Sequence, residues 1–221
     1  MCGDRNGTTR RALEAISVER IDATRLSPGD VAERAASVVF DGGTLVFPKE
    51  TVYALGCDPQ RLAAVERIRH ATGRLGEPLT LHVATVVEAL EYCGRNIRNF
   101  ATVRLLVPGP ITLIIERPRF VDARVTAGLS TLGIRVPDHP LATALLERCG
   151  PLAALPARRQ PRDAWPECDL LIENGPVRSL GESTVLDLTA DRPRMVREGV
   201  ITMEMLERTI GRIDPPFGVK R

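Results

Sequence analysis

Short apolar runs alternate along this chain with longer segments in which apolar residues recur at helical spacing. The runs with the length of buried strands lie at residues 44–47, 78–83, 111–115, 132–136, 152–155, 170–173 and 183–188. The segments with helical spacing or helix-ending residues lie at 27–41, 59–70, 86–93, 97–107, 139–148 and 203–209. Because the elements do not follow a strict repeat of strand, helix and strand, we predict an α/β fold with a twisted mixed sheet and flanking helices.

The composition is that of one folded domain. The chain has 221 residues, of which 43% are apolar and 26% are charged, as is usual for a globular domain. We place this domain at residues 17–210, between a flexible N-terminal tail at 1–16 and a C-terminal tail at 211–221. No run approaches the roughly 18 apolar residues of a membrane helix, and the first residues lack the apolar segment of a signal peptide. We therefore expect a cytoplasmic protein that does not enter a membrane.

The charge, the cysteines and histidines, and the lysine content bear on nucleic acid binding, on metal binding and on the sequence motifs. The net charge is only +2, so bulk electrostatics gives no argument for nucleic acid binding. The five cysteines and three histidines are scattered, without the spacing of metal ligands. Lysine is rare, because Lys49 and Lys220 are the only lysines among 30 basic residues. The scattered cysteines and histidines therefore predict no zinc site. Because lysine is so rare, a lysine inside a motif indicates a role there more strongly than one of many lysines would.

The most informative stretch is residues 48–56, with the sequence Pro-Lys-Glu-Thr-Val-Tyr-Ala-Leu-Gly. Further motifs follow in order: Gly-Arg at 73–74, Pro-Leu-Thr-Leu-His at 78–82, Pro-Gly-Pro-Ile-Thr-Leu at 108–113, Thr-Ala-Gly-Leu-Ser-Thr at 126–131, Gly-Ile-Arg-Val-Pro-Asp-His-Pro at 133–140, Gly-Pro-Leu-Ala-Ala at 150–154, Glu-Ser-Thr-Val at 182–185 and Arg-Glu-Gly at 197–199. This ordered set resembles the YrdC-like family of threonylcarbamoyl-adenylate synthases. The family's first motif reads Phe-Pro-Thr-Glu-Thr-Val-Tyr-Gly-Leu-Gly, so Lys49 and Ala54 are changes within it.

The resemblance implies a single YrdC-like domain whose twisted mixed sheet and flanking helices surround a basic cavity. It also implies a reaction in which L-threonine, bicarbonate and ATP are combined and pyrophosphate leaves. The product, threonylcarbamoyl-adenylate (threonylcarbamoyl-AMP), passes to a downstream transferase that modifies adenosine 37 of transfer RNA. Mg²⁺ is expected to accompany ATP, with no metal ligand from the protein. Cationic side chains are needed because negative charge develops on the phosphates during transfer.

By position in these motifs, the resemblance assigns five residues to the amino acid: Thr51, His82, Arg135, Ala154 and Ser183. Arg135 is the natural clamp for a carboxylate, because a guanidinium can donate two parallel hydrogen bonds. Its place inside an apolar strand also requires an anionic partner. As isolated residues, His82 would more often be a hydrogen-bonded core residue and Ser183 an ordinary strand residue.

The resemblance assigns Arg74, Thr131 and Arg197 to the nucleotide, but two nucleotide motifs are altered. The family's Lys-x-Arg becomes Thr-Gly-Arg at 72–74, which removes the lysine, and the segment that follows is one residue shorter. The family's Pro-Ser-Ala-Asn becomes Leu-Pro-Ala-Arg at 155–158, which removes the serine and the asparagine. The nucleotide side of the site has therefore diverged more than the amino acid side.

Lys49 and Arg158 are the candidate replacements for the lost positive charge and polar contacts. For Lys49 the alternative is a solvent-facing substitution at the end of a strand. The lead hypothesis is a threonylcarbamoyl-AMP synthase-like nucleotidyltransferase that has rearranged its nucleotide ligands.

Two other functions stay open. The first is a diverged paralogue in specialised metabolism that uses another amine, acceptor or phosphate donor in carbamoyl transfer. The second is a non-catalytic RNA-binding protein of weak affinity, suggested by Arg158, Arg159 and Arg162. A solvated loop is the simpler explanation of these three arginines, because the net charge is close to zero.

Overall fold

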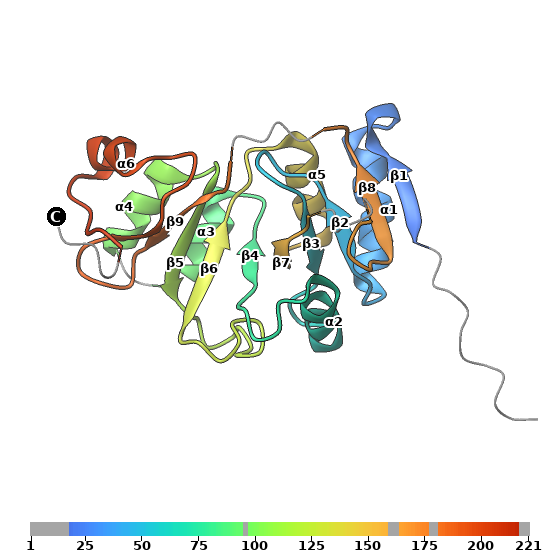
Figure 1. Ribbon diagram of the computed structural model, residues 1–221, viewed down its shortest axis with the longest axis horizontal. Helices are drawn as coiled ribbons and strands as arrows, with labels where there is room; N and C mark the ends of the chain where they lie inside the picture. Colours follow the sequence, from blue (N-terminus) through green and yellow to red (C-terminus); the bar gives the residue numbers. More distant parts are fainter. Residues whose placement is uncertain (1–17, 95–96, 159–163, 177–180, 217–221) are drawn as a thin grey trace, which may run out of the picture.

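A single sheet runs through the structure and positions the helices around it (Figure 1). The computed structural model describes residues 18–94, 97–158, 164–176 and 181–216. The strands are β1 (Glu19–Asp22), β2 (Leu45–Phe47), β3 (Ala54–Cys57), β4 (Thr80–His82), β5 (Ile111–Glu116), β6 (Thr131–Arg135), β7 (Leu152–Pro156), β8 (Leu170–Glu173), β9 (Thr184–Asp187) and β10 (Arg194–Arg197). The helices are α1 (Pro28–Phe40), α2 (Leu62–Thr72), α3 (Val86–Tyr92), α4 (Ile97–Leu106), α5 (Pro140–Cys149) and α6 (Met203–Ile210), with a 3-10 helix at Ala23–Arg25.

Parallel and antiparallel pairs are interspersed in this sheet, whose order is β1-β8-β2-β3-β7-β4-β6-β5-β9-β10. Strands β1 and β2 both run parallel to β8, β4 runs parallel to β6, and β5 runs parallel to β9. The other neighbouring strands are antiparallel. The predicted α/β fold, with a mixed sheet and flanking helices, is therefore confirmed.

Alternate side chains of a strand point to opposite faces of the sheet, and this alternation divides the core in two. On β2, Val46 joins one apolar cluster together with residues of α2, α3, α4 and α6. Its neighbours Leu45 and Phe47 join the other cluster, beneath α1 and α5. Figure 1 shows α1 and α5 together near β2 and β8, and α4 and α6 at the opposite end of the sheet. The two helical layers therefore cover opposite faces of the sheet, and α1 and α5 lie over the end of their face near β2 and β8.

Three strands have no counterpart in the sequence prediction. Strand β3 is buried along its whole length, so its sequence Ala-Leu-Gly-Cys shows no alternation of polar and apolar residues. Strands β1 and β10 lie at the two edges of the sheet, where charged residues interrupt the apolar pattern. Of the loop predicted at 156–168, Pro156 belongs to β7, and residues 159–163 lie outside the described residues.

The packed part of the domain continues beyond residue 210. Ile213 is fully buried, and the backbone of Asp214 pairs with that of Arg194 in β10. The predicted N-terminal tail at 1–16 lies outside the described residues, as do residues 217–221. Within the described part of the chain, no helix is both long enough and apolar enough to cross a membrane.

Gly199 allows the segment after β10 to lie directly against the start of β9. A Cβ atom at this position would lie 2.6 Å from the Ser183 carbonyl carbon and 2.6 Å from the Thr184 nitrogen. We predict that Gly199→Ala lowers the free energy of unfolding by about 1–3 kcal/mol, because the backbone must move to make room. Denaturant unfolding measures this loss.

Gly29→Ala in α1 is the matched control for that substitution. There the nearest atom to an added Cβ is Ser27 Oγ at 3.8 Å, which is ordinary contact. We expect Gly29→Ala to leave stability unchanged or raise it slightly, because alanine favours the helix. Equal losses from the two substitutions would contradict the close approach at Gly199.

Candidate functional site

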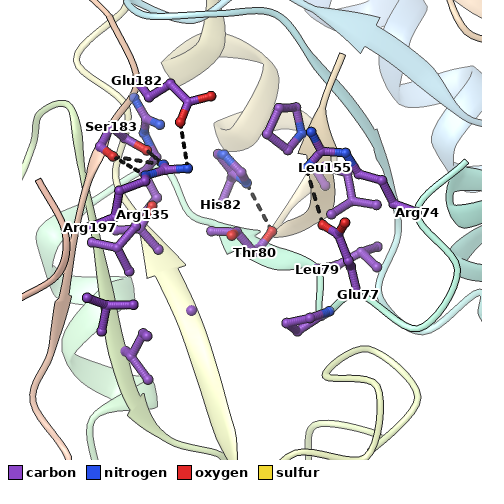
Figure 2. A pocket seen from close by; sticks show the side chains of 18 of the residues that line it. Arg74, Glu77, Leu79, Thr80, His82, Arg135, Leu155, Glu182, Ser183 and Arg197 are labelled. Atoms are coloured by element: carbon purple, nitrogen blue, oxygen red, sulfur yellow. Dashed lines mark hydrogen bonds and ion pairs between the residues drawn. The ribbon is translucent and has the colours of Figure 1, made fainter. Parts of the chain in front are cut away.

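Polar and small side chains share one face of the central strands, while their neighbours along each strand are buried and apolar. On β4, Thr80 and His82 line a cavity, whereas Leu81 belongs to the core. The parallel pairing of β4 with β6 sets Thr80 beside Gly133 and His82 beside Arg135, and paired residues point to the same face. The result is a cavity of about 460 Å³ over β7, β4, β6, β5 and β9 (Figure 2).

Most of the predicted site residues meet at this cavity. Eight of them line it: Lys49, Arg74, His82, Thr131, Arg135, Ala154, Ser183 and Arg197. Thr51 is buried beside it, and its hydroxyl accepts a hydrogen bond from Arg135 Nη2 at 3.1 Å. Arg158 does not line the cavity but forms an ion pair with Glu182, which does. The fold thus gathers residues that are up to 148 positions apart in the sequence, from Lys49 to Arg197.

Arg135 enters the cavity wall with an anionic partner from the first motif. Its side chain is only 3% exposed, and Nη2 donates to Glu50 Oε1 at 2.6 Å. The Nε atom of Arg135 is buried and has no partner among the described groups, and neither has Oε2 of Glu50. The guanidinium therefore keeps a free donor, and a buried donor without a partner is costly until an anion meets it.

Lys49 points into the protein, so its interpretation as a solvent-facing substitution is wrong. It is 4% exposed, and its Nζ lies 3.0 Å from Nε2 of His82. The other ring nitrogen, Nδ1, lies 3.1 Å from the carbonyl oxygen of Thr80. Because a carbonyl only accepts, we assign the ring proton to Nδ1. Nε2 is then the acceptor of a hydrogen bond from Lys49.

Burial favours the neutral forms of both partners in this pair. It lowers the pKa of the Lys49 amine well below its usual range, and the nearby charge of Arg135 lowers it further. Burial likewise lowers the pKa of His82 well below its usual range, and the charges of Lys49 and Arg135 act in the same direction. An amine and an imidazole that share one hydrogen bond therefore form part of the cavity wall.

The arginines assigned to the nucleotide each have a carboxylate partner at the cavity. Arg197 forms an ion pair with Glu182 at 3.0 Å and also donates to the carbonyl oxygen of Ser183 at 2.8 Å. Arg74 forms an ion pair with Glu77 at 3.2 Å. Figure 2 shows Arg74 and Glu77 on one side of the cavity and Arg197 and Glu182 on the other. Each side of the cavity thus holds one ion pair between an arginine and a glutamate.

Sequence reasoning missed the three acidic residues of this site, Glu50, Glu77 and Glu182. Two of them stand inside quoted motifs, directly before Thr51 and Ser183, and this adjacency was the available signal. Glu77 is the last residue of the shortened segment after Arg74, and only the structure shows that it folds back to pair with that arginine. Thr72, which replaces the family's lysine, hydrogen-bonds to its own helix at the carbonyl of Ile68.

No preformed metal centre is found in the described ranges of the chain. They hold no cluster of three or more His, Cys, Asp and Glu side chains that could bind a metal ion. The four described cysteines are buried and free. Burial raises the pKa of Cys57 to about 12 and that of Cys149 to about 12, so these thiols are inert apolar groups.

The structure defines the class as an α/β protein with a mixed sheet, whose cavity lies on the part of one face that α1 and α5 do not cover and is lined by arginines. Sequence comparison then gives the family. The profile of the Sua5/YciO/YrdC domain, whose description reads "Telomere recombination", matches residues 37–199. The chain therefore belongs to the Sua5/YciO/YrdC family, and the resemblance to YrdC-like proteins is confirmed.

Individual relatives agree with this assignment. A threonylcarbamoyl-AMP synthase of Bacillus subtilis is 36% identical over an alignment of 201 residues that covers 84% of this chain. A crystal structure of Pyrococcus abyssi Sua5 complexed with L-threonine superposes with a TM-score of 0.77 at 30% identity and covers 92% of this chain. The crystal structure of Escherichia coli YciO has a TM-score of 0.69 at 30% identity and covers 83% of this chain.

The chain is shorter than some of these relatives. It spans 58% of the length of the Bacillus subtilis protein and 64% of the Pyrococcus abyssi chain. It spans 94% of the Escherichia coli YciO chain. The family domain is therefore the part that this chain shares with all three.

Substitution of Arg135 and Glu50 should show that they form one buried unit. We predict that Arg135→Met lowers the free energy of unfolding by about 3–5 kcal/mol, because it leaves the carboxylate of Glu50 without its partner. Adding Glu50→Gln should restore most of this loss. Denaturant unfolding of the wild type, the two single variants and the double variant gives the coupling energy. Additive losses would contradict the ion pair.

The buried amine of Lys49 should make stability depend on pH. Its pKa is lowered on folding, so between the folded and unfolded pKa values the unfolded chain binds more protons. Stability should therefore rise with pH, by up to about 1.4 kcal/mol per pH unit within that window. Lys49→Met should flatten this slope, as measured by denaturant unfolding between about pH 7 and about pH 9. Identical slopes in the two proteins would contradict the buried amine.

Proposed function

We propose that this protein is a threonylcarbamoyl-AMP synthase-like nucleotidyltransferase of the cytoplasm. It makes a carbamoyl-adenylate from L-threonine, bicarbonate and ATP for the N6-threonylcarbamoyladenosine modification of transfer RNA. The observation that carries the proposal is Arg135, a guanidinium that lines the cavity, is held by Glu50 and has not used all of its hydrogen-bond donors. The similarity of the whole chain to Pyrococcus abyssi Sua5, which was crystallised with L-threonine, supports an amino acid as one substrate.

The amino acid end of the cavity is built for an α-amino acid. In the proposal, the guanidinium of Arg135 donates to the substrate carboxylate, and Glu50 keeps it in place through its 2.6 Å ion pair. Ser183 and the backbone of Ala154 stand at the same cavity and complete the contacts to threonine. Because these groups are buried, their hydrogen bonds to a bound substrate are shielded from competition with water.

The phosphate end is more open and more adaptable. The side chains of Arg74 and Arg197 are 33% and 43% exposed, so a nucleotide phosphate can reach both and compete with Glu77 and Glu182. The two arginines therefore fit the phosphates of Mg²⁺-ATP, in which the metal ion comes with the nucleotide and offsets part of the phosphate charge. Arg158, paired with Glu182, is the basic group that replaces the family's asparagine contact.

The cavity also suits an unstable product. A carbamoyl-adenylate is a mixed anhydride that water hydrolyses, so a site that makes it must exclude water. Val52, Leu79, Ile114 and Val185 contribute apolar surface to the lining. A downstream transferase is the partner that the product requires.

The test of this function is the release of pyrophosphate from ATP. We predict release that requires L-threonine and bicarbonate together. In the double variant Glu50→Gln/Arg135→Met, threonine affinity by calorimetry should fall about ten- to hundredfold, since a hydrogen bond to a charged group contributes about 1.5–3 kcal/mol. Arg148→Met is the matched control, because Arg148 lies on α5 and pairs with Glu33, away from the cavity.

Other outcomes identify the other two functions. Release with a different amine, and none with threonine, would establish the diverged paralogue. The absence of nucleotide binding, with RNA affinity that falls steeply with salt, would establish the RNA-binding protein. Of the three arginines behind that last hypothesis, Arg159 and Arg162 lie outside the described residues, and Arg158 is engaged by Glu182.

A further inference from the structure

Lys49 is a buried amine that forms no ion pair with any carboxylate among the described residues. Its Nζ has one hydrogen-bond partner among the described residues, Nε2 of His82 at 3.0 Å. The adjacent Glu50 is held by Arg135 at 2.6 Å, and no described acidic group lies within ion-pair distance of Nζ. An unpaired ammonium in such a wall is costly, so the neutral amine is the stable form of the empty cavity.

The charges around Lys49 agree with this state. Burial is the largest cause of the lowered pKa of the amine; the charges of Arg135 and Arg197 lower it further, whereas the charge of Glu50 raises it. The Nδ1–H of His82 is bound to the Thr80 carbonyl, so the ring can only accept from Lys49. A neutral Lys49 that donates one N–H to His82 keeps its lone pair for another proton.

The position of Lys49 relative to Arg135 matters for a bound amino acid. His82 and Arg135 are partners in the register of β4 and β6, and Lys49 contacts His82. An α-carboxylate held by the Arg135 guanidinium carries its amine on the adjacent carbon atom. Lys49, His82 and Arg135 all line the same cavity, so an amino acid held in this way can direct its amine toward Lys49 and His82.

From this geometry we infer that Lys49 is the base that takes up the proton released when the amine of the bound amino acid becomes a carbamate. The inference rests on the proposed function, because that function supplies L-threonine and bicarbonate. It assigns to Lys49 a catalytic role at the amino acid end of the cavity, whereas replacement of a lost nucleotide contact would place it at the phosphate end.

The step balances with the groups named. Threonine ammonium (R–NH₃⁺), HCO₃⁻ and the neutral amine of Lys49 (–NH₂) give the carbamate R–NH–COO⁻, one water and Lys49 as –NH₃⁺. A bond forms between the substrate nitrogen and the carbonate carbon, and the bond from that carbon to the departing oxygen breaks as water leaves. The ammonium of Lys49 then faces the carbamate anion, so the charge that was costly in the empty cavity gains its partner.

Carbamate formation without ATP isolates this step. Wild type, Lys49→Met and Lys49→Arg are each incubated with L-threonine and ¹³C-bicarbonate, and bound carbamate is measured by ¹³C NMR. Lys49→Arg keeps a positive charge but cannot accept a proton, so it separates a base from a simple counter-ion. Lys49→Met has a similar length and no charge, and Arg148→Met serves as the unaffected control on α5.

We expect at least tenfold less bound carbamate in both Lys49 variants than in the wild type. If Lys49→Arg does not fold, as judged by its unfolding transition, Lys49→Met carries the comparison. Undiminished carbamate in Lys49→Met, or threonine bound to wild type without any carbamate, would overturn the assignment. An undiminished signal in Lys49→Arg alone would also overturn it, because a fixed positive charge would then suffice.

The pH dependence of pyrophosphate release gives a second reading. Wild-type release should fall as pH is lowered, because a proton on Lys49 removes the base before the substrate binds. Lys49→Thr, which restores the family residue, should lose this acidic limb and be slower at high pH by at least tenfold. An unchanged limb in Lys49→Thr would count against the base.

Failure of the proposed function is distinguishable from failure of this inference. If wild type does not bind threonine by calorimetry, the proposed function fails first. If threonine binds and carbamate forms independently of Lys49, only the assignment of the base is overturned.

Discussion

The buried ion pair between Arg135 and Glu50 is the interaction on which the cavity depends. Burying a guanidinium that is only 3% exposed is costly unless an anion is in contact with it. Glu50 supplies that anion from the first motif, 85 positions earlier in the chain. The pair therefore holds the segment after β2 over the end of β6. With that segment in place, Lys49 lies against His82 and Thr51 against Arg135.

Lys49 stands apart from the other cationic residues that line the cavity. Arg135, Arg197 and Arg74 form ion pairs with Glu50, Glu182 and Glu77 respectively. An anionic ligand must therefore compete with carboxylates at Arg74 and Arg197, and bidentate phosphate or carboxylate groups are the ligands best able to do so. Lys49 has an imidazole as its partner instead. A lysine can lose its proton when it is buried, whereas an arginine cannot. Lys49 can therefore accept a proton from a bound group, which the arginines cannot do.

The strands and helices with strong periodicity were predictable, because burial of one face imposes a repeat of two or of 3.6 residues. Strand β3 was not, because it is buried along its whole length and its run Ala-Leu-Gly-Cys carries no such repeat. For Lys49 the sequence left two alternatives: a side chain that points into the cavity or one that points to solvent. Position at the end of a strand is compatible with either direction, and the choice was made by the distant partner His82.

The sequence by itself determined the family, the class of fold and the set of basic residues that meet at the cavity. These depend on ordered local motifs and on periodicity, which are properties of neighbouring residues. Only the tertiary structure decided which half of the sheet face α1 and α5 leave uncovered, which carboxylate joins each arginine, and that Lys49 is buried against His82. Alternation fixes which residues of a strand share a face. What covers that face is set by the packing of segments that are far apart in the chain.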